Sequence, residues 1–363
     1  MSTRRRVLFL SRSFPPVVGG METHNAALAR HLPQHFDTIA VVNPMGRKGL
    51  GRYLCRAVWA VLINARKVDA ILLGDGVLSV LAPLVRLLAP RVTVVCVLHG
   101  LDVTYPNPIY QRLWPGFFQR HMTQLIAVSR ATAAAAIERG VPAERLHVIG
   151  NGIDLPEHLP SRDQAALCRQ LGLSLNGRQV LLLLGRLVRR KGAEWFVREV
   201  MPELRGTYLL VIAGDGPERA RIEHAIAHAG LEGSVSLLGK VDEDTKLKLL
   251  VSADLLVQPN IPVAGDMEGF GLTVLEAAAA GLPVAASRLE GLEDALNEGE
   301  TGWLVAPGNA LAWKELLMQL AHTPEVRAAR AQHARERVRE SGTWESVVAL
   351  YAEVINAAAQ SGT

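Results

Sequence analysis

The sequence of 363 residues contains only three cysteines, and this scarcity excludes several kinds of site. Cys55, Cys96 and Cys168 are far apart, and no two of them form a Cys-x-x-Cys pair. Disulfide frameworks and thiolate metal sites need regularly spaced cysteines, so we expect neither. A protein without them suits a reducing compartment, and we therefore expect a cytoplasmic location.

Long apolar runs are also lacking. The run Val7–Leu10 is too short for the core of a signal peptide, so we expect no such peptide. The longest candidate for a membrane span, Ala57–Ala65, contains Asn64 and is flanked by Arg56 and Arg66, which argues against a transmembrane helix. No motif typical of nucleic-acid binding is present either, and we expect no nucleic-acid partner.

The composition, with 49% hydrophobic and 20% charged residues, is that of an ordinary globular protein, and the length suggests about two domains. Charge is unevenly distributed. Residues 1–165 carry 19 Lys and Arg against 10 Asp and Glu, whereas residues 166–363 carry 20 against 25. A basic first half fits contact with an anionic partner, and it fits a solvated surface equally well.

Short, continuously apolar runs alternate with longer helical stretches along the chain. Such runs are typical of parallel strands covered on both faces, and their alternation with helices indicates βαβ units. We therefore predict an α/β fold with two Rossmann-like, doubly wound domains, residues 1–165 and 166–342, and a last helix over residues 343–363. The predicted strands are Val7–Leu10, Thr38–Val42, Ala70–Leu73, Val92–Leu98, Leu125–Val128, His147–Ile149, Val180–Leu184, Tyr208–Ala213, Val235–Leu238, Leu255–Gln258, Pro283–Ala286 and Trp303–Val305.

Ligands of doubly wound sheets bind at the carboxyl ends of the strands, so the residues that follow strands are the candidates for a site. Gly19 and Gly20 follow the first strand and precede a helix predicted over residues 23–32. Glycine lets the backbone approach a ligand, and a helix start offers free N–H groups to a phosphate, although a plain turn fits as well. The spacing is not Gly-x-Gly-x-x-Gly, which argues against an NAD-dependent dehydrogenase.

Three further polar residues follow predicted strands. His99 comes after the fourth strand, where it can donate a hydrogen bond to a substrate hydroxyl or polarise a group, although a lone histidine is often structural. Arg186 and Lys191 follow the first strand of the second domain, beside a helix predicted over residues 194–201. An arginine fork and a lysine charge near a helix N-terminus suit a diphosphate, and a solvated basic loop is the alternative.

The most informative stretch runs from Glu268 to Glu276. Phe270, Gly271, Leu272 and Thr273 open a predicted helix that ends at Gly281, so its N-terminus offers free N–H groups to a phosphate. Glu276 is an acid within an otherwise apolar helix, and the two hydroxyls of a ribose would satisfy it. Glu268 lies before the helix, in a glycine-rich loop that we expect to face the same pocket.

These motifs together resemble glycosyltransferase family 4, which has the GT-B fold. The resemblance rests on Glu268-x7-Glu276, on Gly185-Arg186 with Lys191-Gly192, on Ala213–Pro217, on Asn151–Asp154 and on the early Pro-Pro-x-x-Gly-Gly-x-Glu22. It covers the chain from about Pro15 to Trp344.

The resemblance implies two Rossmann-like domains facing each other across a cleft, and a retaining transfer of sugar from a nucleotide diphosphate donor such as a UDP- or GDP-sugar. Arg186 and Lys191 would bind the donor diphosphate, and Glu276 the ribose. Glu268, with Phe270, Gly271, Leu272 and Thr273, would contact the donor sugar and phosphate. His99 would lie beside the transferred sugar, and Gly19 and Gly20 would lie over the phosphates. The last helix would cross back to the first domain.

Cations and a helix N-terminus aimed at the leaving phosphate lower the barrier without a metal, so we expect no cofactor and no metal site. The Asp242-Glu243-Asp244 string opens a predicted helix and is better explained by the helix dipole. The acceptor is expected to be a glycan or a lipid-linked sugar of cell-surface polysaccharide or lipopolysaccharide synthesis.

Basic residues around an aromatic helix at Tyr53–Ile63, and the stretch Tyr110–Phe118, fit a peripheral site on an anionic membrane surface, and a packed helix fits equally. The basic residues are Arg47, Lys48, Arg52, Arg56, Arg66 and Lys67. Two further alternatives stay open for the whole chain: a sugar-nucleotide 2-epimerase of the same fold, and a catalytically inactive module that binds a sugar or a nucleotide.

Overall fold

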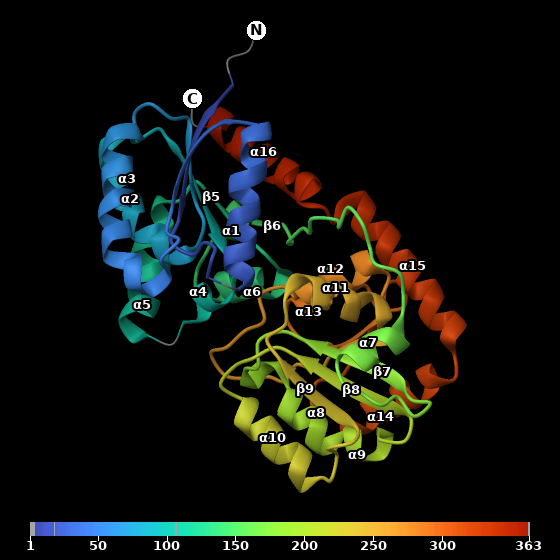
Figure 1. Ribbon diagram of the computed structural model, residues 1–363. Coiled ribbons are helices and arrows are strands. Elements are labelled where there is room, and N and C mark those ends of the chain that lie inside the picture. Colours follow the sequence, from blue (N-terminus) through green and yellow to red (C-terminus); the bar gives the residue numbers. More distant parts are fainter. Residues whose placement is uncertain (1–3, 18, 106, 362–363) are drawn as a thin grey trace. The chain divides into compact units, whose positions relative to one another are not determined.

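The computed structural model describes residues 4–17, 19–105 and 107–361, and the chain divides into two compact units (Figure 1). Unit 1 consists of residues 1–152, 265–270 and 342–363, and unit 2 of residues 153–264 and 271–341. The sequence places the first boundary after residue 165 instead. The segment before helix α7 (Gln164–Gln170) belongs to unit 2, where Arg162 forms an ion pair of 2.6 Å with Asp254.

Unit 1 is built on a six-stranded parallel sheet with the strand order β2-β1-β3-β4-β5-β6. Leu8 and Leu10 of β1 point into the core formed with α2 and α3, whereas α1 and α16 lie side by side elsewhere in the unit, with α16 against β4 (Figure 1). The strands are β1 (Arg6–Ser11), β2 (Asp37–Val42), β3 (Ala70–Leu73), β4 (Thr93–Leu98), β5 (Gln124–Ala127) and β6 (Leu146–Val148). The α-helices are α1 (Gly20–His31), α2 (Leu50–Asn64), α3 (Ala82–Leu88), α4 (Leu101–Thr104), α5 (Pro108–Leu113), α6 (Arg130–Glu138) and α16 (Trp344–Ser361).

Unit 2 contains a second six-stranded parallel sheet, ordered β12-β11-β10-β7-β8-β9. One core packs α8, α9, α10 and α14 on the sheet, and the other packs α7, α11, α12 and α13 on it. The strands are β7 (Gln179–Leu184), β8 (Tyr208–Ala213), β9 (Val235–Gly239), β10 (Leu255–Gln258), β11 (Val284–Ser287) and β12 (Trp303–Val305). The α-helices are α7 (Gln164–Gln170), α8 (Ala193–Glu199), α9 (Met201–Leu204), α10 (Arg219–His228), α11 (Glu243–Ser252), α12 (Leu272–Ala280), α13 (Leu292–Ala295), α14 (Ala310–Ala321) and α15 (Pro324–Ser341).

All twelve predicted strands are present, with bounds that differ by at most one residue at each end. Their side chains are almost continuously buried in β1, β3, β4, β7, β8 and β10, as expected for parallel strands covered on both faces. The prediction of an α/β fold with two doubly wound sheets is therefore confirmed. Within the described residues, no helix is both long enough and apolar enough to span a bilayer.

The last helix, α16, belongs to unit 1, although its sequence follows unit 2. Val348, Tyr351 and Ile355 repeat at helical spacing and are completely buried, so they form the packing face of the helix. The Tyr351 hydroxyl lies 3.2 Å from Nε2 of His24 in α1, and Nδ1 of His24 lies 2.7 Å from the Asn151 side-chain oxygen. These contacts attach the end of the chain to the first helix of unit 1. The final two residues of the predicted helix lie outside the described residues.

Candidate functional site

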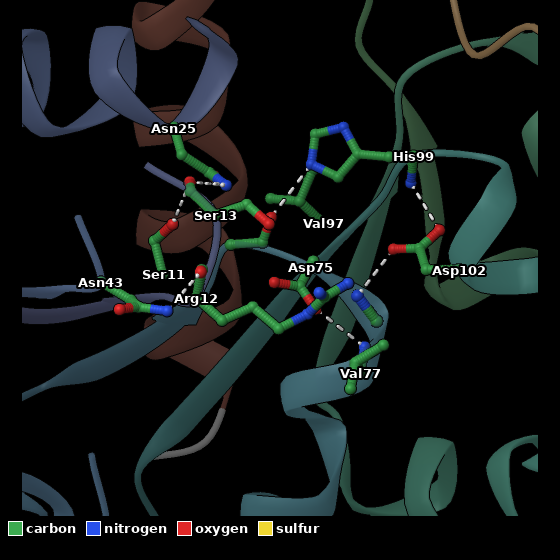
Figure 2. A network of polar contacts seen from close by, with 12 residues as sticks. Ser11, Arg12, Ser13, Asn25, Asn43, Asp75, Val77, Val97, His99 and Asp102 are labelled. Atoms are coloured by element: carbon green, nitrogen blue, oxygen red, sulfur yellow. Dashed lines mark hydrogen bonds and ion pairs between the residues drawn. The ribbon is translucent and has the colours of Figure 1, made fainter. Parts of the chain in front are cut away.

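The carboxyl end of β4 carries His99, and its side chain is already hydrogen-bonded (Figure 2). Nε2 lies 2.9 Å from the carbonyl oxygen of Gly74, which can only accept, so Nε2 carries the proton. Burial, together with the charge of Arg12, lowers the pKa of His99 to about 4 despite the bond to Gly74, so the ring is neutral at pH 7. The predicted donor is thus engaged within the unit, and the remaining nitrogen, Nδ1, can only accept a hydrogen bond.

The backbone around His99 is held by a buried carboxylate. Oδ1 of Asp102 accepts the N–H of His99 at 2.8 Å, and Oδ2 accepts the N–H of Gly76 at 2.7 Å (Figure 2). Burial raises the pKa of Asp102 to about 6, with a further upward contribution from Asp75, while the two backbone bonds lower it. Asp102 therefore fixes the turn after β4 to the turn after β3, and both turns lie at the same edge of the sheet.

The loop that holds Glu268 also belongs to unit 1. A Cβ on Gly269 would lie 2.9 Å from the carbonyl oxygen of His99, so only glycine permits this close approach. Phe270 is buried, and its ring occupies the space that a side chain at Gly150 would need. Glu268 itself is 7% exposed. The structure thus places Gly269, the residue between Glu268 and Phe270, against the backbone of His99, within a unit other than the one to which the sequence assigns this loop.

The glycine pair after β1 forms the start of α1. Gly19 is the N-cap and Gly20 the first residue, so the helix begins three residues before the predicted position. The cap has no side chain that accepts a hydrogen bond from the first turn. The glycine pair thus forms the helix N-terminus instead of preceding it, and binding of a phosphate there stays a prediction.

In unit 2, the turn after β7 presents the two predicted phosphate-binding cations. Arg186 is exposed, and its guanidinium makes no hydrogen bond or ion pair with any residue that the structure describes. Lys191 is 8% exposed, and its Nζ donates to Oε1 of Gln258 at 3.4 Å. Gln258 ends β10, the neighbour of β7 in the sheet, so Lys191 lies where the two strands end.

Helix α12 has the predicted bounds. Gly271 is its N-cap with φ 94°, a left-handed conformation that favours glycine, and Gly281 is its C-cap. Leu272 and Thr273 form the first turn, where backbone N–H groups are free of helical partners. In the part of unit 2 that the structure describes, the hydroxyl of Thr273 is buried without a hydrogen-bond partner.

Glu276 has a protein partner that the sequence did not predict. Its Oε1 accepts from Nζ of Lys246 in α11 at 2.9 Å, and 27% of its side chain is exposed. Burial lowers the pKa of Lys246, but Glu276 and Glu243 more than offset this and raise it overall. The carboxylate is thus positioned by a cation, and its other oxygen is available to a ligand.

The acidic string at the start of α11 serves the helix. Asp242 is the N-cap, and its side chain accepts the N–H of Thr245 at 2.8 Å. Asp244 forms an ion pair with Lys248 one turn on, at 2.6 Å. The interpretation of this string as helix-stabilising acids is confirmed.

Sequence reasoning missed two residues at the edge of the first sheet. Arg12 directly follows β1, and Asp75 lies two residues beyond the end of β3; their side chains form an ion pair of 2.8 Å. The rule that identified His99, a polar side chain just after a strand, applies to both. Lys246 carried no comparable signal, because it lies within a helix and does not follow a strand directly.

Several solved structures share this architecture. Three crystal structures of HepE from Anabaena, with UDP, UDP-glucose or UDP and glucose, each align over 97% of this chain and 100% of theirs, at 22–23% identity and TM-scores of 0.78–0.82. The catalytic domain of starch synthase IV from Arabidopsis thaliana, bound to ADP and acarbose, aligns over 99% of this chain and 100% of its own, at 17% identity and a TM-score of 0.78. Two parallel six-stranded sheets of this kind define a GT-B fold.

Two family models match the chain: Glycosyltransferase Family 4 over residues 18–157 and Glycosyl transferases group 1 over residues 169–337. The chain belongs to glycosyltransferase family 4. It is 30% identical over 248 residues to the amylovoran biosynthesis glycosyltransferase AmsK of Erwinia amylovora, covering 66% of this chain and 58% of that protein. A GDP-mannose-dependent phosphatidylinositol monomannoside mannosyltransferase of Mycolicibacterium smegmatis is 25% identical over 96% of this chain and 98% of its own.

Proposed function

We propose that this protein is a retaining, metal-independent hexosyltransferase that uses a nucleotide diphosphate sugar. The observation that carries the proposal is the set of groups at the carboxyl edge of the second sheet. Arg186, Lys191 and the first turn of α12 supply cationic and N–H donors, and Glu276 supplies a carboxylate held by Lys246. Donors of this kind match a diphosphate, and a carboxylate matches the hydroxyls of a ribose.

The proposed chemistry follows from those groups. When the bond between the sugar and the phosphate breaks, negative charge develops on the leaving oxygen, and fixed cations stabilise it. Arg186 and Lys191 would carry this role in place of a metal ion. The acceptor hydroxyl would attack on the side from which the diphosphate leaves and would give its proton to that diphosphate. The neutral His99 would accept a hydrogen bond at Nδ1 from a hydroxyl of the transferred sugar.

The names of the relatives indicate which classes of donor and acceptor this protein uses. One acts in amylovoran biosynthesis, one is named for GDP-mannose, and the HepE structures hold UDP-glucose. We propose that the acceptor is a glycan or lipid-linked sugar of cell-surface polysaccharide or lipopolysaccharide synthesis. The aligned region spans 58% of the Erwinia relative, so this assignment rests on part of that protein.

We also propose that unit 1 meets an anionic membrane surface from the cytoplasmic side. Helix α2 buries Tyr53, Ala57 and Val61, which confirms the packed face. Its opposite face exposes Trp59 by 65% and Leu62 by 48%, together with Arg52 and Arg56. Apolar and basic side chains on one helix face suit an anionic interface. The second predicted stretch, Tyr110–Phe118, adds less to this surface, because Trp114 is buried. The side chain of Arg47, another of the predicted basic residues, lies outside the described residues.

A thermal-shift screen tests the donor site. The full-length protein is heated with UDP, GDP, ADP or NAD, each in EDTA and in Mg²⁺, and the stabilising nucleotide is then supplied as its sugar conjugate. We expect one nucleoside diphosphate to raise the melting temperature in EDTA, and the conjugate to release nucleotide diphosphate. A new sugar nucleotide instead would identify a 2-epimerase, binding without turnover would identify an inactive module, and no shift would refute the donor site.

The membrane proposal has a separate test. Binding of the protein to vesicles of phosphatidylcholine, with and without phosphatidylglycerol, is measured by co-sedimentation. We expect anionic vesicles to bind the protein and Trp59→Ala to weaken that binding, whereas Trp195→Ala in unit 2 serves as the control. Equal binding of wild type and Trp59→Ala would contradict the assignment of this face.

A further inference from the structure

The first sheet has a topological switch point between β1 and β3, where ligands of doubly wound sheets bind. Its strand order begins β2-β1-β3, so the chain leaves β1 toward one side of the sheet and β3 toward the other. Arg12 follows β1 directly, and Gly74 and Asp75 follow β3. Of the predicted donor-binding residues, Gly19 and Gly20 lie farther along the segment that follows β1, at the start of α1.

The backbone at Arg12 is fixed by buried polar side chains, as Figure 2 shows. Asn43 donates to the carbonyl oxygen of Arg12 at 3.1 Å. Asn25 and Ser11 both donate to the carbonyl oxygen of Ser13, at 3.2 and 2.8 Å. Ser11 and Asn25 are completely buried and Asn43 is 3% exposed. Buried polar groups that hydrogen-bond to the backbone in this way hold a loop in one conformation.

The Arg12 side chain is also positioned, yet part of it remains accessible. Its Nε donates to Oδ1 of Asp75 at 2.8 Å, and the same oxygen accepts the N–H of Val77 at 3.0 Å. The side chain of Arg12 is 26% exposed, whereas that of Asp75 is fully buried. Among the residues that the structure describes, the two terminal nitrogens of Arg12 make no hydrogen bond, and Oδ2 of Asp75 accepts none.

The charges around Arg12 indicate what its free nitrogens bind. The guanidinium charge is already matched by Asp75, and the carboxylate of Asp102 lies close enough to act on Arg12 electrostatically. An anionic ligand would add negative charge to a site with one cation and two buried acids, which is costly in a low dielectric. Neutral hydroxyls accept hydrogen bonds from a guanidinium without that cost.

We propose that Arg12, held by Asp75, contacts the acceptor by donating hydrogen bonds to hydroxyls of an uncharged sugar. Arg12 is then the residue that selects the acceptor, and Asp75 is a positioning residue. The inference rests on the proposed transferase function, because it assigns the acceptor side of the same reaction.

Ligand-observed saturation-transfer NMR tests the proposal on the full-length protein, with the nucleoside diphosphate that stabilises it. The probes are methyl glucopyranoside, which is neutral, and glucuronate, which has the same ring with a carboxylate. The test variants are Arg12→Lys, which removes the fork, and Arg12→Gln combined with Asp75→Asn, which removes both members of the ion pair. The matched control is Arg6→Gln, because Arg6 lies at the other end of β1 and also pairs with an aspartate through Nε, at 3.0 Å.

We expect methyl glucopyranoside to give the stronger signal with wild type and Arg6→Gln, and about threefold or more signal to be lost in both Arg12 variants. A cooperative thermal unfolding transition with a midpoint close to that of wild type verifies that the variants fold, and nucleotide stabilisation verifies that the donor site of unit 2 is intact. Equal signals in wild type and the double variant, a preference for glucuronate, or no signal from the neutral sugar would each overturn the proposal. Failure of wild type to bind any nucleotide would instead refute the transferase function.

Discussion

The cations at the carboxyl edges of the two sheets have different partners. In unit 1, Arg12 pairs with a buried aspartate, and a second buried aspartate lies nearby. In unit 2, Arg186 is exposed without a partner among the described residues, and Lys191 donates to an amide oxygen. A cation that a carboxylate has neutralised favours neutral ligands, whereas an exposed cation such as Arg186, which has no such partner among the described residues, keeps its field for an anion.

The same contrast applies to the acids. Asp75 and Asp102 of unit 1 are buried and serve the backbone and Arg12, whereas Glu276 of unit 2 keeps 27% of its side chain exposed beside Lys246. We therefore expect the two six-stranded parallel sheets to bind different ligands, because the residues at their strand ends differ. Four experiments test that difference, beginning with the largest expected effect.

Replacement of Lys191 by alanine tests the anion site of unit 2. We expect sugar transfer to slow by about 10²-fold or more, because a fixed cation beside the leaving phosphate is lost. Steady-state release of nucleotide diphosphate measures the effect. Lys248→Ala, which removes a half-exposed lysine of the same unit, is the control. Wild-type turnover by Lys191→Ala would remove this residue from the mechanism.

Replacement of Glu276 by alanine tests the ribose contact. We expect the dissociation constant of the nucleotide to rise about tenfold, which corresponds to about 1.4 kcal/mol. Titration calorimetry with the nucleoside diphosphate and with its 2′-deoxy form provides the measurement. Glu243→Ala, which removes the other partner of Lys246, is the control. If Glu276→Ala affects both nucleotides equally, the carboxylate does not contact the 2′-hydroxyl.

Replacement of His99 by alanine tests whether its neutral imidazole accepts a hydrogen bond from the transferred sugar. We expect transfer to fall about tenfold, as for loss of one well-placed hydrogen bond. Because the pKa of His99 is about 4, its ring stays neutral as the pH falls from 7 to 5, and the wild-type rate should show no loss from its protonation. A pH–rate profile of wild type against His99→Ala checks this. An inflection near pH 6.5 present only in wild type would contradict it.

The smallest effect concerns stability in unit 1. The pKa of Asp102 is about 6 in the folded protein against 3.8 for an ordinary aspartate, so the folded state takes up its proton first as the pH falls. Asp102 therefore destabilises the fold above pH 6, and this cost is relieved progressively as the pH falls from about 6 to 3.8. The unfolding free energy of wild type relative to Asp102→Asn should rise by about 1 kcal/mol from pH 7 to pH 5. Denaturant titrations at both pH values measure it, and a difference independent of pH would contradict the buried titration.

Much of the fold could be read from the sequence because burial leaves a direct pattern. Strands such as Tyr208–Ala213 and Leu255–Gln258 are apolar throughout, and both occur with the predicted bounds. Helix α12 was bounded equally well, since Gly271 and Gly281 adopt left-handed conformations that favour glycine. Local steric preference and burial determine such features within a few residues.

The partners of side chains could not be read in this way. These contacts join residues that are far apart in the chain. Examples are the hydrogen bond from His99 to Gly74 and the ion pair of Glu276 with Lys246. Glu268 likewise belongs to unit 1, although most of that unit lies far from it in the sequence. A single sequence gives no register between such segments. The roles of the predicted donor-binding residues stay predictions for the same reason, since they depend on how a ligand lies against them.

Unit 1 is completed only by the last segment of the chain. Tyr351 and Trp344 of α16 lie against His24, with a ring separation of 5.1 Å for Trp344. During synthesis, the ribosome makes residues 1–152 first, yet their core stays open until α16 has emerged. Unit 2 can close earlier, because most of its sequence is continuous. A released chain that ends at Ser341 contains all of unit 2 but lacks α16, so it should have a first unit that chaperones and proteases still recognise, beside a second unit that is complete.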